Sequence, residues 1–522
     1  MNETEPKARR KLPIGIQTFR LIREEGYYYA DKTAQIERLI EHGRHYFLSR
    51  PRRFGKSLLL DTIKEVFEGS ENLFRGLHIH GRRDWKRRHP VVRLDFSGDF
   101  STTEKLEGVA LALLDGVERK FGVTPRHATP DNRLRHLIAE LHERHGERVV
   151  VLIDEYDKPI LDALGDPEIA RANRDFLRGL YGVIKSCDAH IRFTLLTGVS
   201  KFSKVNLFSG LNNLRDITLD PRFATICGYT EGDLDAVFAP ELEGLDREKV
   251  REWYNGYNWC GESRVYNPFD ILLLFDRREY RAWWFETGTP RFLVETLIRH
   301  CVNAFALDGL IADDGLLSSF EVDEIAPEAL LFQTGYLTVE EYSTGDGAAW
   351  YRLGYPNREV RQSLNNALLK RLVGGAGGAG GPAARNRLYD GFLDHDLAAV
   401  EAEFRAVFAG IPSDWHRRND IARFEGYYAS VFYACLAALG FDLRVEDASA
   451  AGRVDLALRC GGRVYLFEFK VIERAGEGSA LRQLIERGYA EKHRAAGEPV
   501  HFIGVEFSEE TRNVANFETA AT

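Results

Sequence analysis

The segment that ends in Gly55, Lys56 and Ser57 contains the residue types that bind nucleotide phosphates. It matches the end of the pattern G-x-x-x-x-G-K-[ST], in which backbone N–H groups at the start of a helix surround phosphate oxygens. The lysine of this pattern pairs with the β- and γ-phosphates, and the hydroxyl group binds Mg²⁺. Arg50 occupies the position of the first glycine, so the match is incomplete.

Three arginines, Arg50, Arg52 and Arg53, precede the glycine and lysine. Arg50 lacks the freedom of glycine to adopt a positive φ, which is a real departure from the pattern. Beside a phosphate site, arginine side chains could bind phosphate oxygens through charge-assisted hydrogen bonds. A solvated basic loop is the alternative interpretation of the same residues. We include Arg53 among the candidate nucleotide-binding residues.

Two acidic residues, Asp154 and Glu155, directly follow an apolar segment at residues 149–153. A carboxylate at the carboxyl end of a central strand is suited to hold Mg²⁺ beside a nucleotide, and its neighbour can polarise the attacking water. Another apolar segment, residues 191–196, is followed by Thr197, whose hydroxyl could sense the γ-phosphate. The alternatives are an ordinary acidic loop for the carboxylates and a simple turn for Thr197.

A second group of reactive residues lies near the C-terminus, within residues 453–471. The pattern of this segment predicts two strands joined by a Gly-Gly turn. If the loop consists of those two glycines, counting outward along both strands places Asp455 opposite Glu468. The alternation of side chains then puts Lys470 on the same face. The other face is apolar throughout and begins with Val454.

Two carboxylates in opposed positions of a hairpin repel each other, because their Cβ atoms lie about 5 Å apart. The pair Asp455 and Glu468 therefore calls for a cation between them, and both a divalent metal ion and Lys470 meet that need. A solvated face balanced by Arg453 and Lys470 is the alternative. A bulge or a longer loop would shift the register and separate the two carboxylates.

The composition limits the kinds of protein that could carry these residues. The chain has 522 residues, of which 44% are hydrophobic and 29% charged, which is typical of globular proteins. Its net charge of -9 excludes a globally basic nucleic-acid binder but not a local basic groove. Six scattered cysteines without a C-x-x-C pair argue against a zinc cluster or a disulfide framework. No apolar segment has the length of a membrane span or a signal core, so we expect a cytoplasmic protein without a membrane partner.

Short apolar segments alternate with helical ones in the N-terminal part of the chain, at residues 45–48, 91–96, 149–153, 191–196 and 216–219. This alternation predicts an α/β fold with a mostly parallel sheet covered by helices. A Gly- and Ala-rich stretch then separates a smaller C-terminal α/β domain. The expected regions are a P-loop domain at 10–235, a helical extension at 236–372, a linker at 373–387 and the C-terminal domain at 388–515.

Several motifs occur in a fixed order in the first 300 residues, among them RPRRFGKSLLL, LIDEYDKP, LTGVSKFS and FSGLNNL. In this order they resemble the AAA-ATPase-like family of bacteria and archaea, over roughly residues 10–300. An Arg-Pro-Arg-Arg-Phe lead-in is usual there, so Arg50 departs from the general motif but not from the family. The resemblance implies an AAA-type αβα sandwich that binds ATP, although it does not by itself imply turnover.

Asp455 and the triplet Glu468-Phe469-Lys470 resemble the active-site core of the PD-(D/E)XK nuclease fold, over roughly residues 390–510. The resemblance implies that Asp455 and Glu468 bind Mg²⁺, while Lys470 orients the water or stabilises the charged phosphorane. Three more residues match the family pattern, an upstream acidic ligand and a downstream glutamine and tyrosine: Glu425, Gln483 and Tyr489. A surface role for Glu425 and a packing role for Tyr489 are the alternatives.

The two resemblances together predict an ATP-binding, ATP-hydrolysing protein whose nucleotide state controls a Mg²⁺-dependent nuclease. The expected partner is nucleic acid, with DNA favoured over RNA. The chain could also form a homo-oligomer. An ATP-driven switch whose C-terminal domain binds nucleic acid or a protein without cleavage is the alternative. A further alternative is that the protein binds nucleotide without hydrolysing it, and the presence of Glu155 argues against this. The expected catalytic residues are Glu155, Asp455, Glu468 and Lys470. The expected nucleotide-binding residues are Arg53, Gly55, Lys56, Ser57, Asp154 and Thr197. The expected metal ligands are Ser57, Asp154, Glu425, Asp455 and Glu468.

Overall fold

The computed structural model divides the chain into two compact units. The first comprises residues 1–288 and 311–357, and the second comprises residues 289–310 and 358–522. The structure describes residues 9–201, 213–286, 293–294, 297, 307–318, 326–345, 349–372, 381–411, 425–449, 452–472, 479–487 and 497–521. Each unit has its own five-stranded sheet and its own buried apolar core.

Five parallel strands form the large sheet of the first unit, in the order β2-β3-β4-β1-β5. Most of their residues are buried, as expected for parallel strands covered by helices on both faces. All five strands were expected from the sequence, although the last is only two residues long. Their bounds are β1 (His45–Ser49), β2 (Val91–Asp95), β3 (Val149–Asp154), β4 (Ile191–Gly198) and β5 (Arg215–Asp216).

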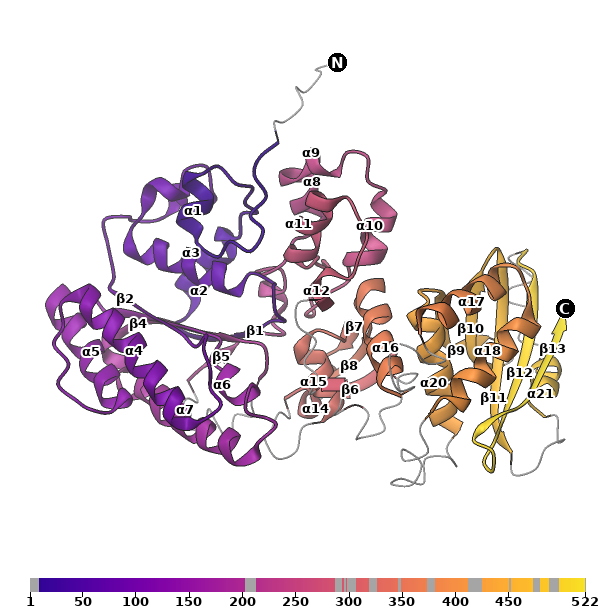
Figure 1. Cartoon of the computed structure of the whole chain (residues 1–522). Helices are drawn as coiled ribbons and strands as arrows, with labels where there is room; N and C mark the ends of the chain where they lie inside the picture. The colour runs from indigo at the N-terminus through magenta and orange to yellow at the C-terminus, as the bar shows by residue number, and fades with distance from the viewer. Residues whose placement is uncertain are drawn as a thin grey trace, which may run out of the picture. The chain divides into compact units, whose positions relative to one another are not determined.

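Helices lie on both sides of this sheet, which gives the three layers of an αβα sandwich (Figure 1). One side carries α1 (Phe19–Glu24), α2 (Thr33–His42) and α3 (Lys56–Glu68). The other carries α4 (Thr103–Phe121), α5 (Pro130–His145), α6 (Lys158–Leu161) and α7 (Pro167–Ser186). Because β4 lies between β1 and β3, the carboxyl ends of these three strands meet at one edge of the sheet.

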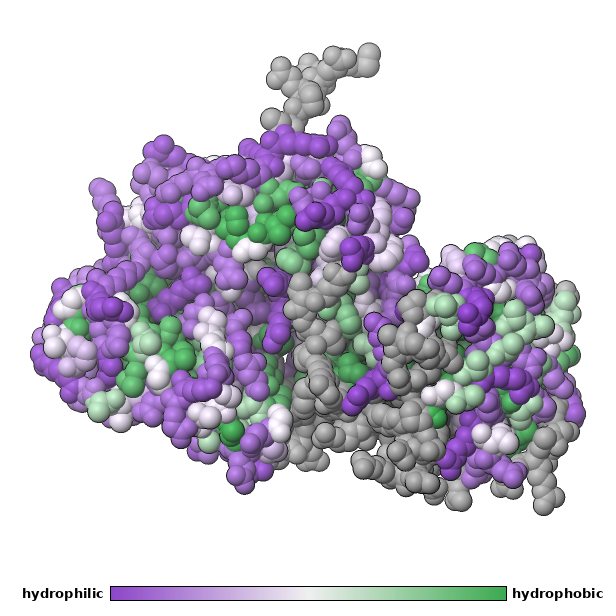
Figure 2. All heavy atoms as spheres, viewed as in Figure 1, coloured by the Kyte–Doolittle hydropathy of each residue, from purple (hydrophilic) through white to green (hydrophobic). Residues whose placement is uncertain are grey.

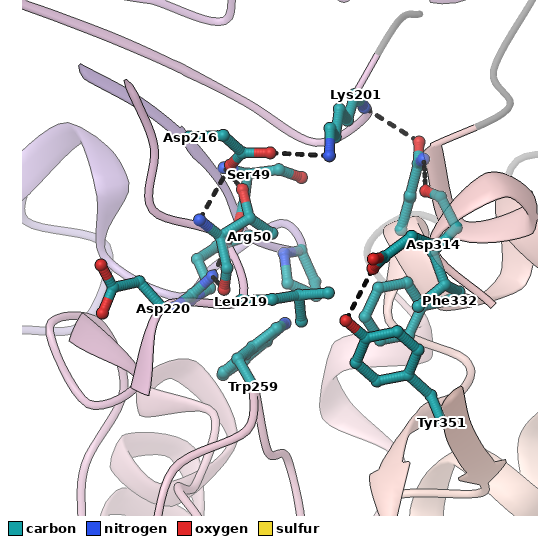
Figure 3. A pocket seen from close by; sticks show the side chains of 14 residues that line it. Ser49, Arg50, Lys201, Asp216, Leu219, Asp220, Trp259, Asp314, Phe332 and Tyr351 are labelled. Atoms are coloured by element: carbon teal, nitrogen blue, oxygen red, sulfur yellow. Dashed lines mark hydrogen bonds and ion pairs between the residues drawn. The ribbon is translucent and has the colours of Figure 1, made fainter. Parts of the chain in front are cut away.

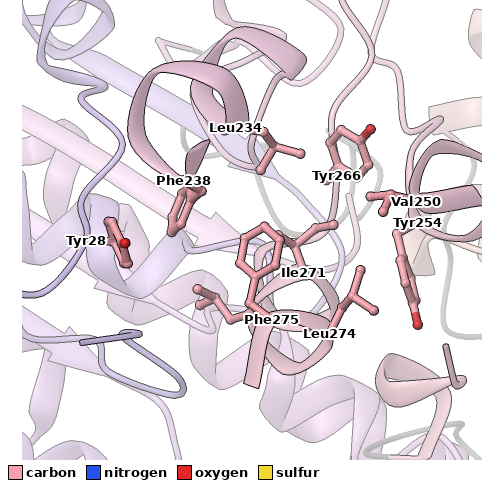
Figure 4. Close-up of a cluster of buried hydrophobic side chains, with 10 residues drawn as sticks. Tyr28, Leu234, Phe238, Val250, Tyr254, Tyr266, Ile271, Leu274 and Phe275 are labelled. Carbon is pink, nitrogen blue, oxygen red and sulfur yellow. The ribbon is translucent and has the colours of Figure 1, made fainter. Parts of the chain in front are cut away.

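A helical segment follows the sheet and has a core of its own (Figure 4). It contains α8 (Glu231–Val237), α9 (Ala239–Leu242), α10 (Arg247–Tyr254), α11 (Pro268–Arg277) and α12 (Trp283–Glu286). Tyr28, from the N-terminal segment, joins this core, with its ring centroid 5.0 Å from that of Phe238. The Tyr28 hydroxyl also donates to Glu241 Oε1 at 3.1 Å. The N-terminal segment is thereby fastened to the helical segment.

The region expected to be mainly helical, residues 236–372, also contains a three-stranded sheet in the order β6-β8-β7. The elements are β6 (Leu310–Asp313), α14 (Asp314–Ser318), α15 (Pro327–Thr334), β7 (Thr338–Ser343) and β8 (Trp350–Gly354). The strands are short and rich in aromatic and β-branched residues, which the sequence pattern did not separate from an aromatic helical core. Helix α16 (Arg358–Leu372) belongs to the second compact unit.

The sheet of the second unit has the order β13-β12-β11-β10-β9, with β11 and β12 parallel and the other pairs antiparallel. Its strands are β9 (Asp442–Ser449), β10 (Gly452–Cys460), β11 (Arg463–Ile472), β12 (Val500–Ser508) and β13 (Asn513–Ala521). The helices are α16, α17 (Pro382–Leu393), α18 (Leu397–Ala409), α20 (Glu425–Ala438) and α21 (Ala480–Glu486). The expected linker at 373–387 is therefore too long, because a proline at the first helical position opens α17 within it. Residues 373–380 lie outside the described part of the chain.

Aromatic side chains join α20 to one face of this sheet. Phe432 lies 5.4 Å from Phe467 and 5.1 Å from Phe469 between ring centroids, and Tyr428 stacks on Phe507 at 4.7 Å. The opposite face has a second cluster, in which Leu484 of α21 packs with Leu466, Val464 and Val454, among others. Val454 was expected on the face of Phe467. The pairing of β10 with β11 ends at Leu456, so the strict alternation on which that expectation rests does not extend to Val454.

Hydrophilic residues cover much of the visible surface, and hydrophobic residues form smaller groups between them (Figure 2). None of the described helices is both long enough and apolar enough to cross a membrane.

Candidate nucleotide and nuclease sites

The phosphate-loop segment connects β1 to α3, as its pattern predicts. Gly55 caps the helix with a φ of 91°, a conformation that glycine adopts without steric cost. Lys56 is buried, and its Nζ donates to the carbonyl oxygens of Arg50 at 2.8 Å and Pro51 at 2.9 Å. Burial lowers the pKa of Lys56, and the nearby Asp154 carboxylate opposes that shift. The loop is thus closed on its own lysine.

Arg50 is not part of a solvated loop, because its guanidinium is bonded within the first unit. Its side chain is fully buried, and its guanidinium donates to the carbonyl oxygens of Thr218 at 2.9 Å and Phe223 at 3.2 Å. The guanidinium also lies 4.1 Å from the ring centroid of Trp259. Burial lowers the pKa of Arg50 to about 10. Arg50 therefore binds the loop to the following part of the first unit.

Arg52 and Arg53 are both exposed. Arg53 adopts a φ of 70°, so the left-handed conformation of this loop falls on Arg53 and on Gly55, and not on Arg50. The Arg53 guanidinium lies 4.7 Å from the ring centroid of Phe269. Its exposure leaves Arg53 accessible to a ligand at the loop.

Asp154 and Thr197 meet at the carboxyl ends of β3 and β4. Both side chains are fully buried, and the Thr197 hydroxyl donates to Asp154 Oδ1 at 2.8 Å. The backbone N–H of Glu155 donates to the same oxygen at 3.1 Å. Asp154 Oδ2 accepts no hydrogen bond from the described residues, and its nearest cation is Arg93 Nη2 at 3.8 Å. A buried carboxylate oxygen of this kind fits Mg²⁺, which prefers oxygen ligands.

Glu155 adopts a φ of 51°, in the left-handed region that non-glycine residues rarely enter. Burial raises the pKa of Glu155, and the neighbouring Asp154 carboxylate raises it further. Strained residues persist where the surrounding structure holds them, and they concentrate at functional sites. The geometry is consistent with a carboxylate held for proton transfer.

The structure adds two charged residues that the sequence did not single out. Arg93 of β2 donates from Nη1 to Asp61 of α3 at 2.9 Å and so lies between α3 and the Asp154 carboxylate. Asp157 is buried and accepts hydrogen bonds from the Ser200 N–H and hydroxyl, both at 2.6 Å. A Cβ atom at Gly198 would overlap with Asp157. Asp157 lies in the motif LIDEYDKP and Gly198 in the motif LTGVSKFS. Both motifs were identified in the sequence, but the contact between them was not predicted.

Two cavities border the phosphate loop. One, of about 70 Å³, lies beside Gly55 and has a mostly apolar lining that includes Tyr28, Leu59 and Tyr229. The other, of about 710 Å³, lies beyond Arg50 (Figure 3). Its wall includes Lys201, whose Nζ pairs with Asp216 at 2.7 Å. The small cavity lies next to the first turn of α3.

From its turn to Leu456, the C-terminal hairpin has the register expected from its sequence. Cys460 pairs with Arg463, and the pairing continues as far as Leu456 opposite Phe467. Asp455, the next residue, accepts a hydrogen bond from the Phe469 N–H at 2.8 Å. Its carboxylate is thereby held at the backbone between Glu468 and Lys470.

Glu468 is 5% exposed, which excludes a solvated hairpin face at this position. Gln483, from α21, donates its side-chain N–H to Glu468 Oε1. Lys470 follows on the same face and is partly exposed. A buried carboxylate, a second carboxylate on the neighbouring strand and a lysine therefore gather at the middle of β11. Carboxylate oxygens of this kind fit Mg²⁺, which usually keeps several waters.

The side chains of two expected residues of this site lie outside the described part of the structure. Glu425 is the first residue of α20, but its side chain lies outside the described part of the structure, and so does Tyr489. Within the described residues, no group of three or more His, Cys, Asp or Glu side chains is arranged to hold a metal ion. A metal at Asp455 and Glu468 would therefore complete its coordination with water or with a side chain such as that of Glu425.

Comparison with known proteins supports both domain assignments. Residues 13–208 match a family described as predicted AAA-ATPase, and residues 423–517 match the PD-(D/E)XK nuclease superfamily. The chain belongs to the AAA-ATPase-like family and carries a C-terminal PD-(D/E)XK domain. It is also similar to an uncharacterized protein encoded in the vnfD 5' region of Azotobacter chroococcum mcd 1. The two are 56% identical over 512 residues, which cover 98% of this chain and 99% of that protein.

Proposed function

We propose that this AAA-ATPase-like protein binds and hydrolyses ATP in its first unit and cleaves nucleic acid in its second, with DNA ahead of RNA as the substrate. The observation that carries the proposal is the arrangement on β11. Glu468 is buried against Gln483, and the Asp455 carboxylate is hydrogen-bonded to the backbone one residue further along. Burial of a carboxylate is costly unless it is paired or binds a metal.

In the first unit, Lys56 would exchange its two carbonyl partners for the nucleotide phosphates. Ser57 and Asp154 would hold Mg²⁺, which when bound offsets the charge of the phosphates. Glu155 would orient the attacking water and accept its proton, and Thr197 would link Asp154 to the state of the γ-phosphate.

In the second unit, Asp455 and Glu468 would hold Mg²⁺, with Glu425 as a third ligand. The metal, when bound, would supply an activated water and offset the charge of the leaving group. Lys470 would orient the water or stabilise the negative charge that develops at the scissile phosphate. Gln483 would fix the orientation of the Glu468 carboxylate through its hydrogen bond.

The test is cleavage of single- and double-stranded DNA and RNA by the full chain, with Mg²⁺ or Mn²⁺ and with or without ATP. We expect metal-dependent cleavage of DNA that falls at least about 100-fold in Lys470→Ala. Lys370→Ala is the matched control, because this exposed lysine lies on α16 of the same unit and should cleave normally. Cleavage that survives in Lys470→Ala would place the active site elsewhere. ATP hydrolysis without any cleavage would favour a switch that acts by binding alone.

A further inference from the structure

Glu506 is a buried carboxylate near the candidate nuclease site that the proposed chemistry does not use. It lies on β12 and is 1% exposed. In the parallel register of β11 and β12, Glu506 is opposite Lys470, and Gly504 is opposite Glu468. Residues in register on adjacent strands share one face of the sheet. Glu506 therefore belongs to the same face as the candidate catalytic residues.

Both carboxylate oxygens of Glu506 accept hydrogen bonds from the protein. Oε1 accepts from the backbone N–H groups of Ser479 at 2.6 Å and Ala480 at 3.2 Å, and Oε2 accepts from the Asn516 side chain at 2.7 Å. Burial alone would raise the pKa of Glu506, but these hydrogen bonds outweigh it and hold the pKa below its ordinary value. Glu506 therefore stays ionised at neutral pH, and its carboxylate caps the N-terminus of a helix.

The helix that Glu506 caps is the one that carries Gln483. Helix α21 begins at Ala480, so Gln483 lies within one turn of the capped N–H groups. Leu484, on the same helix, is fully buried in the cluster beneath the sheet. An anchor at the first turn therefore determines where the Gln483 amide lies relative to Glu468.

Gly504 provides a second, independent sign that the position of α21 is closely defined. A Cβ atom at Gly504 would overlap with the backbone nitrogen of Leu481. The backbone of α21 therefore approaches β12 at the residue that is in register with Glu468. Only glycine permits an approach of this kind without displacing the helix.

We propose that Glu506 is a positioning residue of the nuclease site, which anchors α21 on β12 so that Gln483 orients the Glu468 carboxylate. The proposal rests on the proposed nuclease function for its catalytic meaning. Groups that orient a metal ligand through a hydrogen bond change metal affinity or activity by about 10- to 100-fold when they are lost. The effect of Glu506 must pass through Gln483, which makes the route testable.

The experiment compares Glu506→Ala, Gln483→Ala and the double variant in the full chain, with the Mg²⁺ concentration that half-saturates cleavage as the first readout. We expect each single variant to raise this concentration about 10- to 100-fold and the double variant to add little, because both act on one carboxylate. Gly504→Ala should produce the same shift. Glu510→Ala, at an exposed position after the same strand, is the matched control and should leave it unchanged.

The second readout is hydrogen exchange of the backbone amides in residues 479–487, measured without substrate. Glu506→Ala should speed exchange there, whereas Gln483→Ala should not, since only Glu506 caps the helix. The double substitution Glu506→Gln with Asn516→Asp restores a donor and an acceptor between β12 and β13. We expect it to recover slow hydrogen exchange in residues 479–487. If Glu506 only stabilised the fold, Gln483→Ala would not be expected to raise the half-saturating Mg²⁺ concentration as Glu506→Ala does while leaving hydrogen exchange unchanged.

Three outcomes would overturn the proposal. They are unchanged Mg²⁺ dependence in Glu506→Ala despite faster exchange, additive losses in the double variant, or unchanged exchange in Glu506→Ala. Failure of the proposed function is a separate result, namely a wild-type chain that cleaves nothing. In that case Mn²⁺ binding, measured by electron paramagnetic resonance in an Asp154→Asn background, replaces cleavage. We then expect Glu506→Ala to weaken Mn²⁺ binding at least tenfold, and equal affinity would refute the positioning role.

Discussion

At the scale of single residues, Glu155 combines a strained backbone with a carboxylate of increased proton affinity. Its φ of 51° costs a non-glycine residue about 1 kcal/mol or more. Its N–H is held by Asp154 Oδ1, the oxygen that also accepts from Thr197. Because burial and the Asp154 charge raise its pKa, Glu155 is better suited than an ordinary glutamate to take a proton from water.

Replacing Glu155 by glutamine should abolish turnover and spare nucleotide binding. The amide keeps the size and the hydrogen-bonding oxygen of the side chain but cannot accept a proton, so we expect phosphate release to fall about 100- to 10,000-fold. Glu168→Gln, at an exposed position of α7, removes the same charge away from the site and should hydrolyse ATP normally. Equal, slow hydrolysis by wild type and Glu155→Gln would mean that the first unit binds nucleotide without turning it over.

Single residues also show what a sequence motif can and cannot predict. The spacing of Gly55, Lys56 and Ser57 was enough to predict a strand, a loop and a helix, because the chemistry of the loop depends on neighbours in the chain. The role of Arg50 was not predictable, since its carbonyl partners at Thr218 and Phe223 lie about 170 residues further along. A motif records spacing, whereas the burial of Arg50 is decided by the tertiary fold.

At the scale of elements, the hairpin of β10 and β11 was predictable because its Gly-Gly turn determines the register. Cys460 opposite Arg463 determines the pairing as far as Leu456 opposite Phe467, and Asp455 is the next residue of β10. The sheet of β6, β7 and β8 was not predictable, because strands of four to six residues are too short for their alternation to be told from the pattern of a helical core. Glu506 was also missed, since a lone acidic residue in an apolar strand is informative only once its helix partners are known.

Strand β12 also carries a titratable contact with the connection between α17 and α18. The ring of His501 lies 4.1 Å from that of His395 between centroids. Burial lowers the pKa of His501, and the charges of His395 and Arg463 add to this. The unfolded chain therefore binds a proton more readily than the folded one. The contribution of His501 to the free energy of unfolding is fully present above its unfolded pKa of about 6.5. It is lost as the pH falls toward and through the lower pKa of the folded state.

We therefore expect the unfolding temperature of the second unit to decrease as the pH falls below about 6.5. Calorimetry of the full chain at a series of pH values measures this dependence. His501→Asn should flatten this dependence, because it removes the group that must be protonated. His127→Asn, at an exposed position of the first unit, should leave it as in wild type. A dependence that is unchanged in His501→Asn would assign the titration to other groups.

At the scale of the whole molecule, the two candidate sites lie in different compact units, so any control of one by the other is a coupling between two separate sites. Lys56 belongs to the first unit and Lys470 to the second. Coupling of this kind is reciprocal: if ATP changes the affinity for DNA by some factor, DNA must change the affinity for ATP by the same factor. Reciprocity distinguishes true coupling from two activities that merely share a chain.

A chain with both Glu155→Gln and Lys470→Ala should reveal this coupling, because neither ligand is consumed during the measurement. We expect ATP to change the DNA dissociation constant by about 5- to 150-fold, the range of typical coupling free energies, and DNA to change the ATP dissociation constant equally. Adding Lys56→Ala should remove the effect of ATP while DNA binding remains. Fluorescence anisotropy with labelled DNA and with a labelled ATP analogue measures both constants. If each ligand leaves the other constant unchanged, the two units act independently, and nucleotide control of the nuclease is excluded.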